Sequence, residues 1–304
     1  MITEKLRDIY RNIMSVISSI SPTLTSQIYY FSKFKKKINL KNPKTFNEKL
    51  MYLKLNEYEN NELVTKCSDK YKVREYVKQC GLESTLNELI GIYNNADEID
   101  FEKLPSKFVL KCNHASGFNI ICEDKSKLDI KKAKRQLNKW LKTDYWKYVA
   151  EMQYKNVERK IICEKYLESK DQNSIEDYKI YCFNGKPTIC LVCIDRNLGK
   201  PKKFFFDKNW NLLKINKDGK ELFDKYIIKK PENLGKMYEC AKILSKPFKF
   251  VRVDLYNYNG KVIFGELTFT PAGCVSTSYI DNWDDKLGDM LKIWKLENYN
   301  VKTK

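Results

Sequence analysis

The spacing of apolar residues changes along the chain and divides it into helical and strand-like regions. Apolar side chains from Leu6 to Ile17 recur every three or four positions, so residues 1–40 are predicted to form a helical N-terminal segment. Helical spacing returns over residues 129–155 and 233–245. Two further helices are therefore expected, one in the middle of the chain and one late in it.

Two short sequences carry signals for the start of a helix. Thr45 can cap a helix whose third residue is Glu48, which is the pattern of a capping box. Ser68 can likewise cap a helix over residues 69–80, with Gly81 as its stop. Both helices are expected before the first strand.

Short runs of β-branched and aromatic residues dominate the chain from residue 104 onward. Turn-forming pairs such as Asn184 and Gly185 separate them, as in antiparallel sheets. No internal repeat joins the runs, so distant strands are expected to share a compact α+β body. The predicted strands cover residues 108–110, 120–122, 160–166, 178–183, 188–194, 203–206, 250–256 and 262–268.

The formal charge of +18 arises from 57 basic and 39 acidic residues. Lysines far outnumber arginines, and reading of base edges favours the planar arginine fork, so specific nucleic-acid recognition is not expected. The ten cysteines show no Cys/His spacing for a metal. Reduced, mostly buried thiols in a cytoplasmic protein are the simplest account.

The N-terminal region leaves two interpretations open. The apolar stretch at residues 13–20 is short and contains three serines, so neither a signal peptide nor a membrane-spanning helix is expected. A basic run follows at residues 33–37. The helix is expected to pack on its own domain, and peripheral docking on the inner face of the cell membrane is the alternative.

The Walker-type phosphate loop is absent, because no Gly-Lys pair is followed by Ser or Thr. A nucleotide site in this chain would need a loop of another design. The polar turn after residue 110 offers a candidate. Lys111 supplies a cation, and Ser116 and Gly117 leave backbone N–H groups accessible. His114, the only histidine of the chain, lies in the same turn, where a structural role and a phosphate contact are both open.

The strongest chemical signal lies at residues 250–268. Alternation places Arg252 and Asp254 on the face opposite the apolar residues. Asp254 and Glu266 come from neighbouring strands and repel each other unless a cation separates them. They suit Mg²⁺ bound to nucleotide phosphates, or an ordinary arginine–carboxylate pair. Lys179, on another strand, adds a further cation.

The loop of this hairpin decides whether the two acids meet. A two-residue turn at Asn259 and Gly260 would put Asp254 and Glu266 on opposite faces and so destroy the site. A three-residue loop, with Gly260 as a bulge, makes the acids diagonal neighbours and puts Ile263 on the buried face. We therefore predict the three-residue loop.

Lys111 and Lys179 are expected to point into one cleft, because two cations on separate strands are suited to one polyphosphate. Lys179 is treated as a solvated side chain. Its replacement by alanine is therefore expected to weaken nucleotide binding and leave the fold intact.

Several ordered motifs occur along the chain, at residues 42–49, 69–77, 104–117, 177–179, 183–185 and 251–273. With them the chain, from about residue 42 to 288, resembles the TupA-like branch of the ATP-grasp superfamily, which is associated with teichuronopeptide biosynthesis and is often labelled polysaccharide biosynthesis or glycosyltransferase. The resemblance implies an α+β ATP-grasp fold, with two α+β subdomains gripping ATP. The implied units are a helical segment 1–40, an N-terminal subdomain 41–103, a small lid subdomain 104–168 and a large subdomain 169–304 with the metal site.

The resemblance also implies how ATP is held. Lys111 and Lys179 would bind its phosphates, and the loop from His114 through Ser116 to Gly117 would cover them. Adenine would lie at a hinge whose backbone groups are unpaired before the nucleotide binds. The residues implied there are Glu164, Lys165 and Leu167 for adenine and Glu168 for the ribose.

For the metal and the chemistry, the resemblance implies three oxygen ligands and one arginine. Asp254 and Glu266 would bind Mg²⁺, and Thr268 stands where the wider superfamily usually has an asparagine ligand. Arg252 would steady a developing acyl phosphate. Cys274 stands where a second glycine of its loop would be expected.

The implied reaction activates a carboxylate with ATP and joins it to an amine. The expected substrates are a uronic acid of a capsular or cell-wall polysaccharide and an amino acid. A sugar-nucleotide glycosyltransferase is the alternative within enzymes, although its Asp-x-Asp motif is replaced by weak clusters such as Asp284 and Asp285. A nucleic-acid-binding module that uses the lysines and 20 tyrosines is the alternative of another class.

Overall fold

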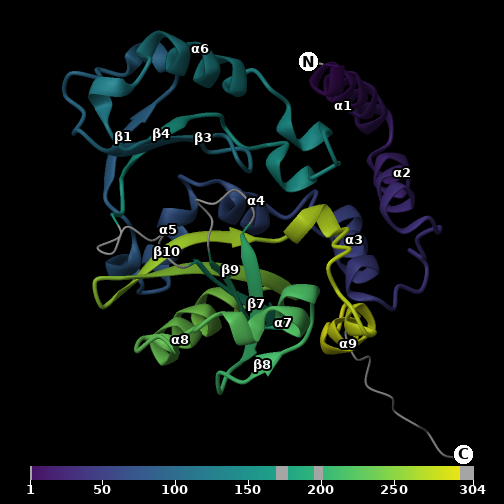
Figure 1. The fold of residues 1–304 in the computed structure, drawn as a ribbon. Coiled ribbons are helices and arrows are strands. Elements are labelled where there is room, and N and C mark those ends of the chain that lie inside the picture. Colours follow the sequence, from purple (N-terminus) through teal and green to yellow (C-terminus); the bar gives the residue numbers. More distant parts are fainter. Residues whose placement is uncertain (1, 169–176, 195–200, 295–304) are drawn as a thin grey trace, which may run out of the picture.

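The computed structural model describes residues 2–168, 177–194 and 201–294, with helices packed around two antiparallel sheets (Figure 1). The smaller sheet has four strands in the order β1-β4-β2-β3, and the larger has six in the order β10-β9-β5-β6-β7-β8. This confirms the α+β class. The strands are β1 Leu89–Tyr93, β2 Phe108–Cys112, β3 Asn119–Cys122, β4 Ile161–Lys165, β5 Asp177–Phe183, β6 Lys186–Ile194, β7 Lys202–Asp207, β8 Leu212–Leu213, β9 Phe250–Tyr258 and β10 Lys261–Thr268.

The helices cover the sheets from several sides. In Figure 1, α6 lies over the small sheet, α4 and α5 lie between the two sheets, and α1 and α2 run along one side of the molecule. Over the described ranges, the helices fall short of the length and apolarity that crossing a membrane requires. Their bounds are α1 Ile2–Ile20, α2 Pro22–Phe34, α3 Phe46–Asn56, α4 Glu62–Ser68, α5 Val73–Gln79, α6 Ile130–Leu141, α7 Lys217–Glu221, α8 Leu234–Ser245 and α9 Trp283–Met290.

Each sheet has its own hydrophobic core. Phe108 and Leu110 of the small sheet pack with Leu137 of α6. On the large sheet, Val251 and Val253 pack with side chains of α3, α4, α5 and α8. The ten cysteines are all unpaired and nine are buried, as expected. Two independently packed sheets give the molecule two halves with a site between them.

The helix signals were correct in one case and wrong in another. The capping box of Thr45 and Glu48 is present at the start of α3, as predicted. Ser68, however, is the last residue of α4 and not a cap, because the chain breaks its helix at residues 69–72 before α5 begins. The carboxylate of Asp69 stabilises this break by accepting the backbone N–H of Tyr71 at 2.7 Å.

The helical prediction over residues 129–155 is also only partly confirmed. α6 ends at Leu141, and short 3₁₀ turns replace it at Tyr145–Lys147 and Met152–Tyr154. In this segment the ring of Tyr145 meets the rings of Phe118, Tyr148 and Tyr154 edge-on. Tertiary packing overrides the local pattern in this segment.

The three-residue hairpin loop was a wrong prediction. Tyr258 pairs directly with Lys261, so the loop has two residues, Asn259 and Gly260. Their φ angles of 50° and 73° are both positive, as a type I′ turn requires. The tight turn is favoured because its twist matches the twist of the two strands.

A β-bulge at Gly265 restores the face that this turn would have reversed. Phe264 pairs with Leu255, and Glu266 then pairs with Asp254, so Gly265 is the extra residue. The acids lie directly opposite each other, and Ile263, opposite Tyr256, belongs to their face and not to the core face. The conclusion that the acids share a face is therefore confirmed, for a different reason.

Candidate active site

The centre of the site is a cluster of charges on β9 and β5. Arg252 holds the carboxylate of Asp254 with two hydrogen bonds, Nε to Oδ1 and an NH₂ nitrogen to Oδ2, each 2.7 Å long. Lys179, from the neighbouring strand, pairs with the same carboxylate and with Asp177, 2.7 Å away. Asp254 is buried. A buried carboxylate with two cations makes a rigid base for the site.

Lys179 is not the solvated side chain that the sequence suggested. Only 13% of its side chain is exposed. Burial works to lower the pKa of Lys179, but the charges of Asp254 and Asp177 outweigh it and raise the pKa above its ordinary value. The lysine therefore carries its charge permanently and holds part of the sheet together.

Glu266 extends the cluster toward solvent. The Thr268 hydroxyl accepts a hydrogen bond from Arg252 at 3.1 Å and donates one to Glu266 at 3.3 Å. The Glu266 side chain is 39% exposed. Partial removal from water works to raise its pKa, but the charges of Lys70, Lys179, Arg252 and Lys111 outweigh this and lower the pKa to about 2. Glu266 is thus ionised at neutral pH and accessible.

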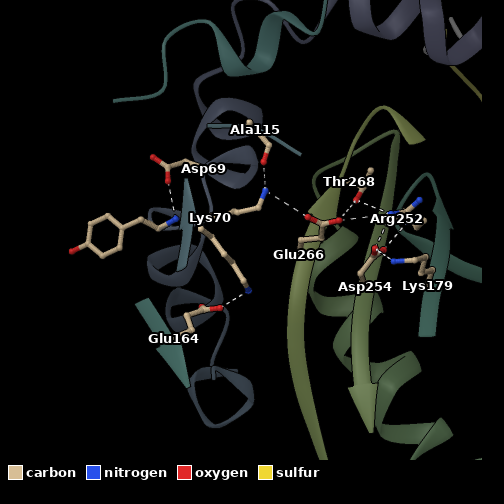
Figure 2. A network of polar contacts seen from close by, with 11 residues as sticks. Asp69, Lys70, Ala115, Glu164, Lys179, Arg252, Asp254, Glu266 and Thr268 are labelled. Carbon is tan, nitrogen blue, oxygen red and sulfur yellow. Dashed lines mark hydrogen bonds and ion pairs between the residues drawn. The ribbon is translucent and has the colours of Figure 1, made fainter. Parts of the chain in front are cut away.

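Lys70 is a site residue that sequence reasoning missed. Figure 2 shows its side chain reaching across from the break between α4 and α5. Its Nζ donates to the carbonyl oxygen of Ala115 at 2.7 Å and lies 3.8 Å from the Glu266 carboxylate. The sequence pattern placed Lys70 inside a continuous helix over residues 69–80, whereas the chain leaves the helix at Asp69. Lys70 joins the loop of the small sheet to the acids of the large sheet.

Lys111 lies on the small-sheet side of the site. Its Nζ pairs with Glu164 at 2.6 Å, and Arg74 contacts the other oxygen of that carboxylate at 3.3 Å. The charges of Lys111 and Lys179 both contribute to the lowered pKa of Glu266. Lys179 is held by two buried carboxylates, and that the two lysines serve one polyphosphate stays a prediction.

The proposed hinge at residues 164–168 differs from expectation in one respect. The backbone N–H of Lys165 donates to the carbonyl of Glu88 at 3.0 Å, and its carbonyl accepts from the Asn87 side chain at 2.9 Å. The prediction that these groups are unpaired is wrong, because β1, which the sequence did not reveal, lies alongside. Leu167 lies beyond the end of β4, and Glu168 pairs with Lys107 at the surface.

His114 turns away from the site. It is buried, and its Nε2 lies 3.3 Å from the carbonyl oxygen of Thr143. Burial, helped by the charge of Arg159, lowers its pKa to about 4, so the ring is neutral at pH 7. A neutral buried ring is suited to holding the loop in place and not to a charge contact with phosphate. Ser116 and Gly117 of the same loop do face an open space.

That space is a cavity of about 1180 Å³ bordering the charge cluster. Arg252, Glu266 and Thr268 lie in its wall together with Ser116 and Gly117. It continues past the charge cluster, where aromatic, cationic and acidic side chains line it: Tyr10, Arg11, Tyr29, Lys33, Trp140, Tyr145, Tyr148, Glu151 and Tyr154. The cavity therefore has room for a second substrate beside the phosphates of a nucleotide.

Asp254 and Glu266 are the candidate magnesium ligands, although both oxygens of the buried Asp254 already accept hydrogen bonds from Arg252. Both offer carboxylate oxygens, which Mg²⁺ prefers, and they lie opposite each other on paired strands. Within the described ranges, no group of three or more His, Cys, Asp and Glu side chains is arranged to hold a metal. Two carboxylates suffice for an ion that keeps water and takes phosphate oxygens as its other ligands.

Comparison with known proteins assigns the family. A family model described as TupA-like ATPgrasp matches residues 48–292, well over half of the chain. The chain belongs to the TupA-like ATP-grasp family. This membership confirms the resemblance drawn from the motifs. The N-terminal helices α1 and α2 lie outside the matched region.

Solved structures of ATP-grasp enzymes are similar at low identity. D-alanine–D-alanine ligase from Bacillus anthracis, complexed with ATP, shares 14% identity, with 75% of this chain and 66% of that chain covered and a TM-score of 0.47. Phosphoribosylamine–glycine ligase from Thermotoga maritima shares 13% identity, with 71% and 52% covered and a TM-score of 0.42. The ATP-grasp ligase PsnB, complexed with Mg and ADP, shares 11%, with 77% and 62% covered and a TM-score of 0.40.

The TupA-like chain covers less than two thirds of the length of each of these three structures. No curated protein matches it.

Proposed function

We propose that this protein is an ATP-dependent ligase that activates a carboxylate as an acyl phosphate and joins it to an amine. The observation that carries the proposal is the charge cluster, of which Arg252 and Glu266 line the cavity. Its ion pairs join five cations to four carboxylates before any substrate is present: Lys70, Arg74, Lys111, Lys179 and Arg252 with Glu164, Asp177, Asp254 and Glu266. A phosphate chain adds negative charge where lysines and an arginine can turn toward it.

In the proposed reaction, a carboxylate oxygen of the substrate attacks the γ-phosphorus of ATP, and the bond to the bridging oxygen breaks to release ADP. The amine nitrogen then attacks the acyl carbon, phosphate leaves, and the nitrogen loses a proton. Arg252 and Lys70 stabilise the negative charge that develops on the phosphoryl oxygens. Asp254 and Glu266 would hold Mg²⁺, which neutralises phosphate charge when bound.

We further propose roles for the remaining residues of the nucleotide site. The small sheet and its loop at Ser116 and Gly117 act as the lid over the phosphates. Glu164 and the chain around Lys165 and Leu167 border adenine, and Glu168 reaches the ribose once it leaves Lys107. The pairing of Lys165 with Asn87 and Glu88 restricts the backbone groups that adenine can use to those beyond β4.

The second substrate is proposed to be a uronic acid of a capsular or cell-wall polysaccharide, joined to an amino acid in the cytoplasm. The width of the cavity and its mixture of tyrosines with Arg11 and Lys33 support a large anionic substrate. A glycosyltransferase gains no support from Asp284, which accepts the backbone N–H of Asn47 at 3.0 Å and so fastens α9 to α3.

The test is to incubate the purified chain with ATP, Mg²⁺, uronic acids and amino acids, and to follow ADP, phosphate and the conjugate by mass spectrometry. Hydroxylamine traps an acyl phosphate as a hydroxamate, so hydroxamate formation with ATP is expected even before the amine is known. Transfer of sugar from a nucleotide sugar without ATP consumption would establish the glycosyltransferase instead.

A matched pair of lysine variants tests the site. Lys70→Met removes a cation that lies 3.8 Å from Glu266, and the KM for ATP is expected to rise about tenfold or more, because a charged hydrogen bond contributes about 1.5–3 kcal/mol. Lys72→Met, at a half-exposed lysine two residues away, should leave the KM unchanged. Equal KM values for both variants would exclude Lys70 from the nucleotide site.

A further inference from the structure

The N-terminal helices have an unusual distribution of charge. Between Arg11 and Lys33 the chain has no charged residue, although 32% of the whole chain is charged. This stretch runs through the second half of α1 and almost all of α2, which lie along one side of the molecule (Figure 1). Helices with a face in water ordinarily carry charged residues on that face.

One face of these helices is apolar and open to solvent. On α1, Ile9, Ile13, Val16 and Ile20 recur at the spacing of one helical stripe and are 53%, 54%, 62% and 82% exposed. Phe31 of α2 is also half exposed. We call the surface formed by Ile9, Ile13, Val16, Ile20, Leu24 and Phe31 the apolar face. Large side chains this exposed in a contiguous row mark a surface that a partner covers.

Contacts on the opposite face hold the helices in this orientation. Met14 and Tyr30 are buried against the body of the protein. The hydroxyl of Ser18, also buried, donates to the carbonyl oxygen of Lys147 at 2.6 Å and lies 3.1 Å from the hydroxyl of Thr25. The side chain of Leu6, which the sequence placed on the packed face, lies outside the described residues. The helix therefore packs on its own domain through one face, as predicted. Its apolar face contacts no partner among the described residues.

The charge beside the apolar face indicates what covers it. Residues 9–47 contain seven basic and no acidic residues. Lys33, Lys35, Lys36 and Lys37 are all exposed at the end of α2, close in sequence to Phe31. A second copy of the chain would bring a like-charged cluster against this one, whereas anionic lipid headgroups neutralise it.

We propose that α1 and α2 dock the protein on an anionic membrane surface, with the apolar face in the interface and the lysines at residues 33–37 among the headgroups. This is the geometry of a helix that lies in the membrane plane. Arg11, Tyr29 and Lys33 of the same helices border the cavity beside Arg252. These residues lie on the sides of α1 and α2 away from the apolar face, so docking holds the cavity near the membrane with the two helices between them. The proposed membrane docking does not depend on the proposed ligase activity.

The test is sedimentation of the full chain with vesicles of phosphatidylcholine alone and of phosphatidylcholine with phosphatidylglycerol. Binding is expected to the anionic vesicles and to fall with salt. Val16→Glu combined with Ile20→Glu should reduce the partition coefficient more than about tenfold, because two charges enter the interface. Ile227→Glu is the matched control, since Ile227 is 91% exposed but lies far from these helices in the chain.

Changing Lys35, Lys36 and Lys37 to glutamine should weaken binding to anionic vesicles with the fold unchanged in thermal unfolding. Equal binding of the wild type and the Val16 and Ile20 variant would overturn the proposal. So would a concentration-dependent dimer in sedimentation equilibrium that the same variant abolishes while vesicles bind neither protein, because the apolar face would then be covered by a second copy.

Discussion

The ionisation of the residues in this site depends on the neighbours that the fold gives them. Glu266 has a pKa of about 2 because four cations surround it, and the pKa of His114 falls to about 4 mainly because the ring is buried. At pH 7 the first is a carboxylate and the second is uncharged. Charge contacts with phosphate are therefore left to lysine and arginine, and the loop histidine has a structural role.

Replacing Lys179 with alanine should destabilise the protein, contrary to what a solvated lysine would do. The change leaves Asp177 and Asp254 buried with one cation fewer, and loss of about 3 kcal/mol or more of the free energy of unfolding is expected. Urea unfolding measures it. Lys186→Ala, at an exposed residue of the adjacent strand β6, is the control and should stay within about 0.5 kcal/mol of the wild type. Equal stability of the two variants would mean that Lys179 is not a structural cation.

The pKa of His114 predicts how stability changes with pH. Because His114 is the only histidine of the chain, one histidine NMR signal measures this pKa. Its pKa in the folded protein, about 4, lies below the ordinary value of 6.5, so the unfolded chain binds the proton more readily. The contribution to stability is complete above about 6.5 and is lost as the pH falls toward 4.

Nuclear magnetic resonance of ¹³C-labelled histidine should show a ring signal that does not titrate between pH 7.5 and 5. His114→Asn should show a shallower loss of stability than the wild type over the window from 6.5 to 4. A titration midpoint near the ordinary value would mean that the ring is exposed to solvent, and the structural role would be withdrawn.

At the scale of elements, the position of Glu266 depends on the β9–β10 hairpin. The type I′ turn at Asn259 and Gly260 sets the pairing of the two strands, and the bulge at Gly265 shifts it by one residue, so that Asp254 lies opposite Glu266. The break between α4 and α5 also interrupts a regular element, and it allows Lys70 to reach the site. The chemistry therefore depends on interruptions of the regular elements.

Gly265→Ala should disrupt the site through the bulge. A Cβ at this position would lie 2.9 Å from the backbone oxygen of Asp254, so the strands must move apart. Loss of at least about 1–3 kcal/mol of stability and of most ATP-dependent turnover is expected. Gly235→Ala is the control: nothing lies within 4 Å of the added Cβ near the start of α8, so stability should stay equal or rise. Full activity of Gly265→Ala would show that the bulge does not set the position of Glu266.

At the scale of the whole molecule, the site is shared between two separately packed halves. Lys111 and Glu164 belong to the small sheet, Lys179 and Glu266 to the large one, and Lys70 bridges them. Such a division leaves the two halves free to adjust around a ligand. A nucleotide that contacts both halves should couple their stabilities.

ATP with Mg²⁺ should therefore raise the temperature of unfolding. At a concentration 100 times the Kd, a ligand stabilises the folded state by about 2.7 kcal/mol, which corresponds to a rise of several degrees for a chain of this size. Removal of Mg²⁺ with EDTA should cancel most of the rise, and Glu266→Gln should do the same. Glu232→Gln, at an exposed residue before α8, should keep it. An equal rise with and without Mg²⁺ would remove the metal from the proposed site.

By itself the sequence determined those features that depend on local patterns. Alternation located β5, β6, β7, β9 and β10, the capping box fixed the start of α3, and the ordered motifs identified the family. Tertiary structure decided what depends on non-local contacts: the neighbours of Lys179, the inward turn of His114 and the reach of Lys70. Single residues could not reveal these, because burial and pairing are set by segments distant in the chain. The register of the hairpin shows both effects, since a two-residue turn and a bulge at Gly265 put Asp254 and Glu266 on one face, as the predicted three-residue loop would have done.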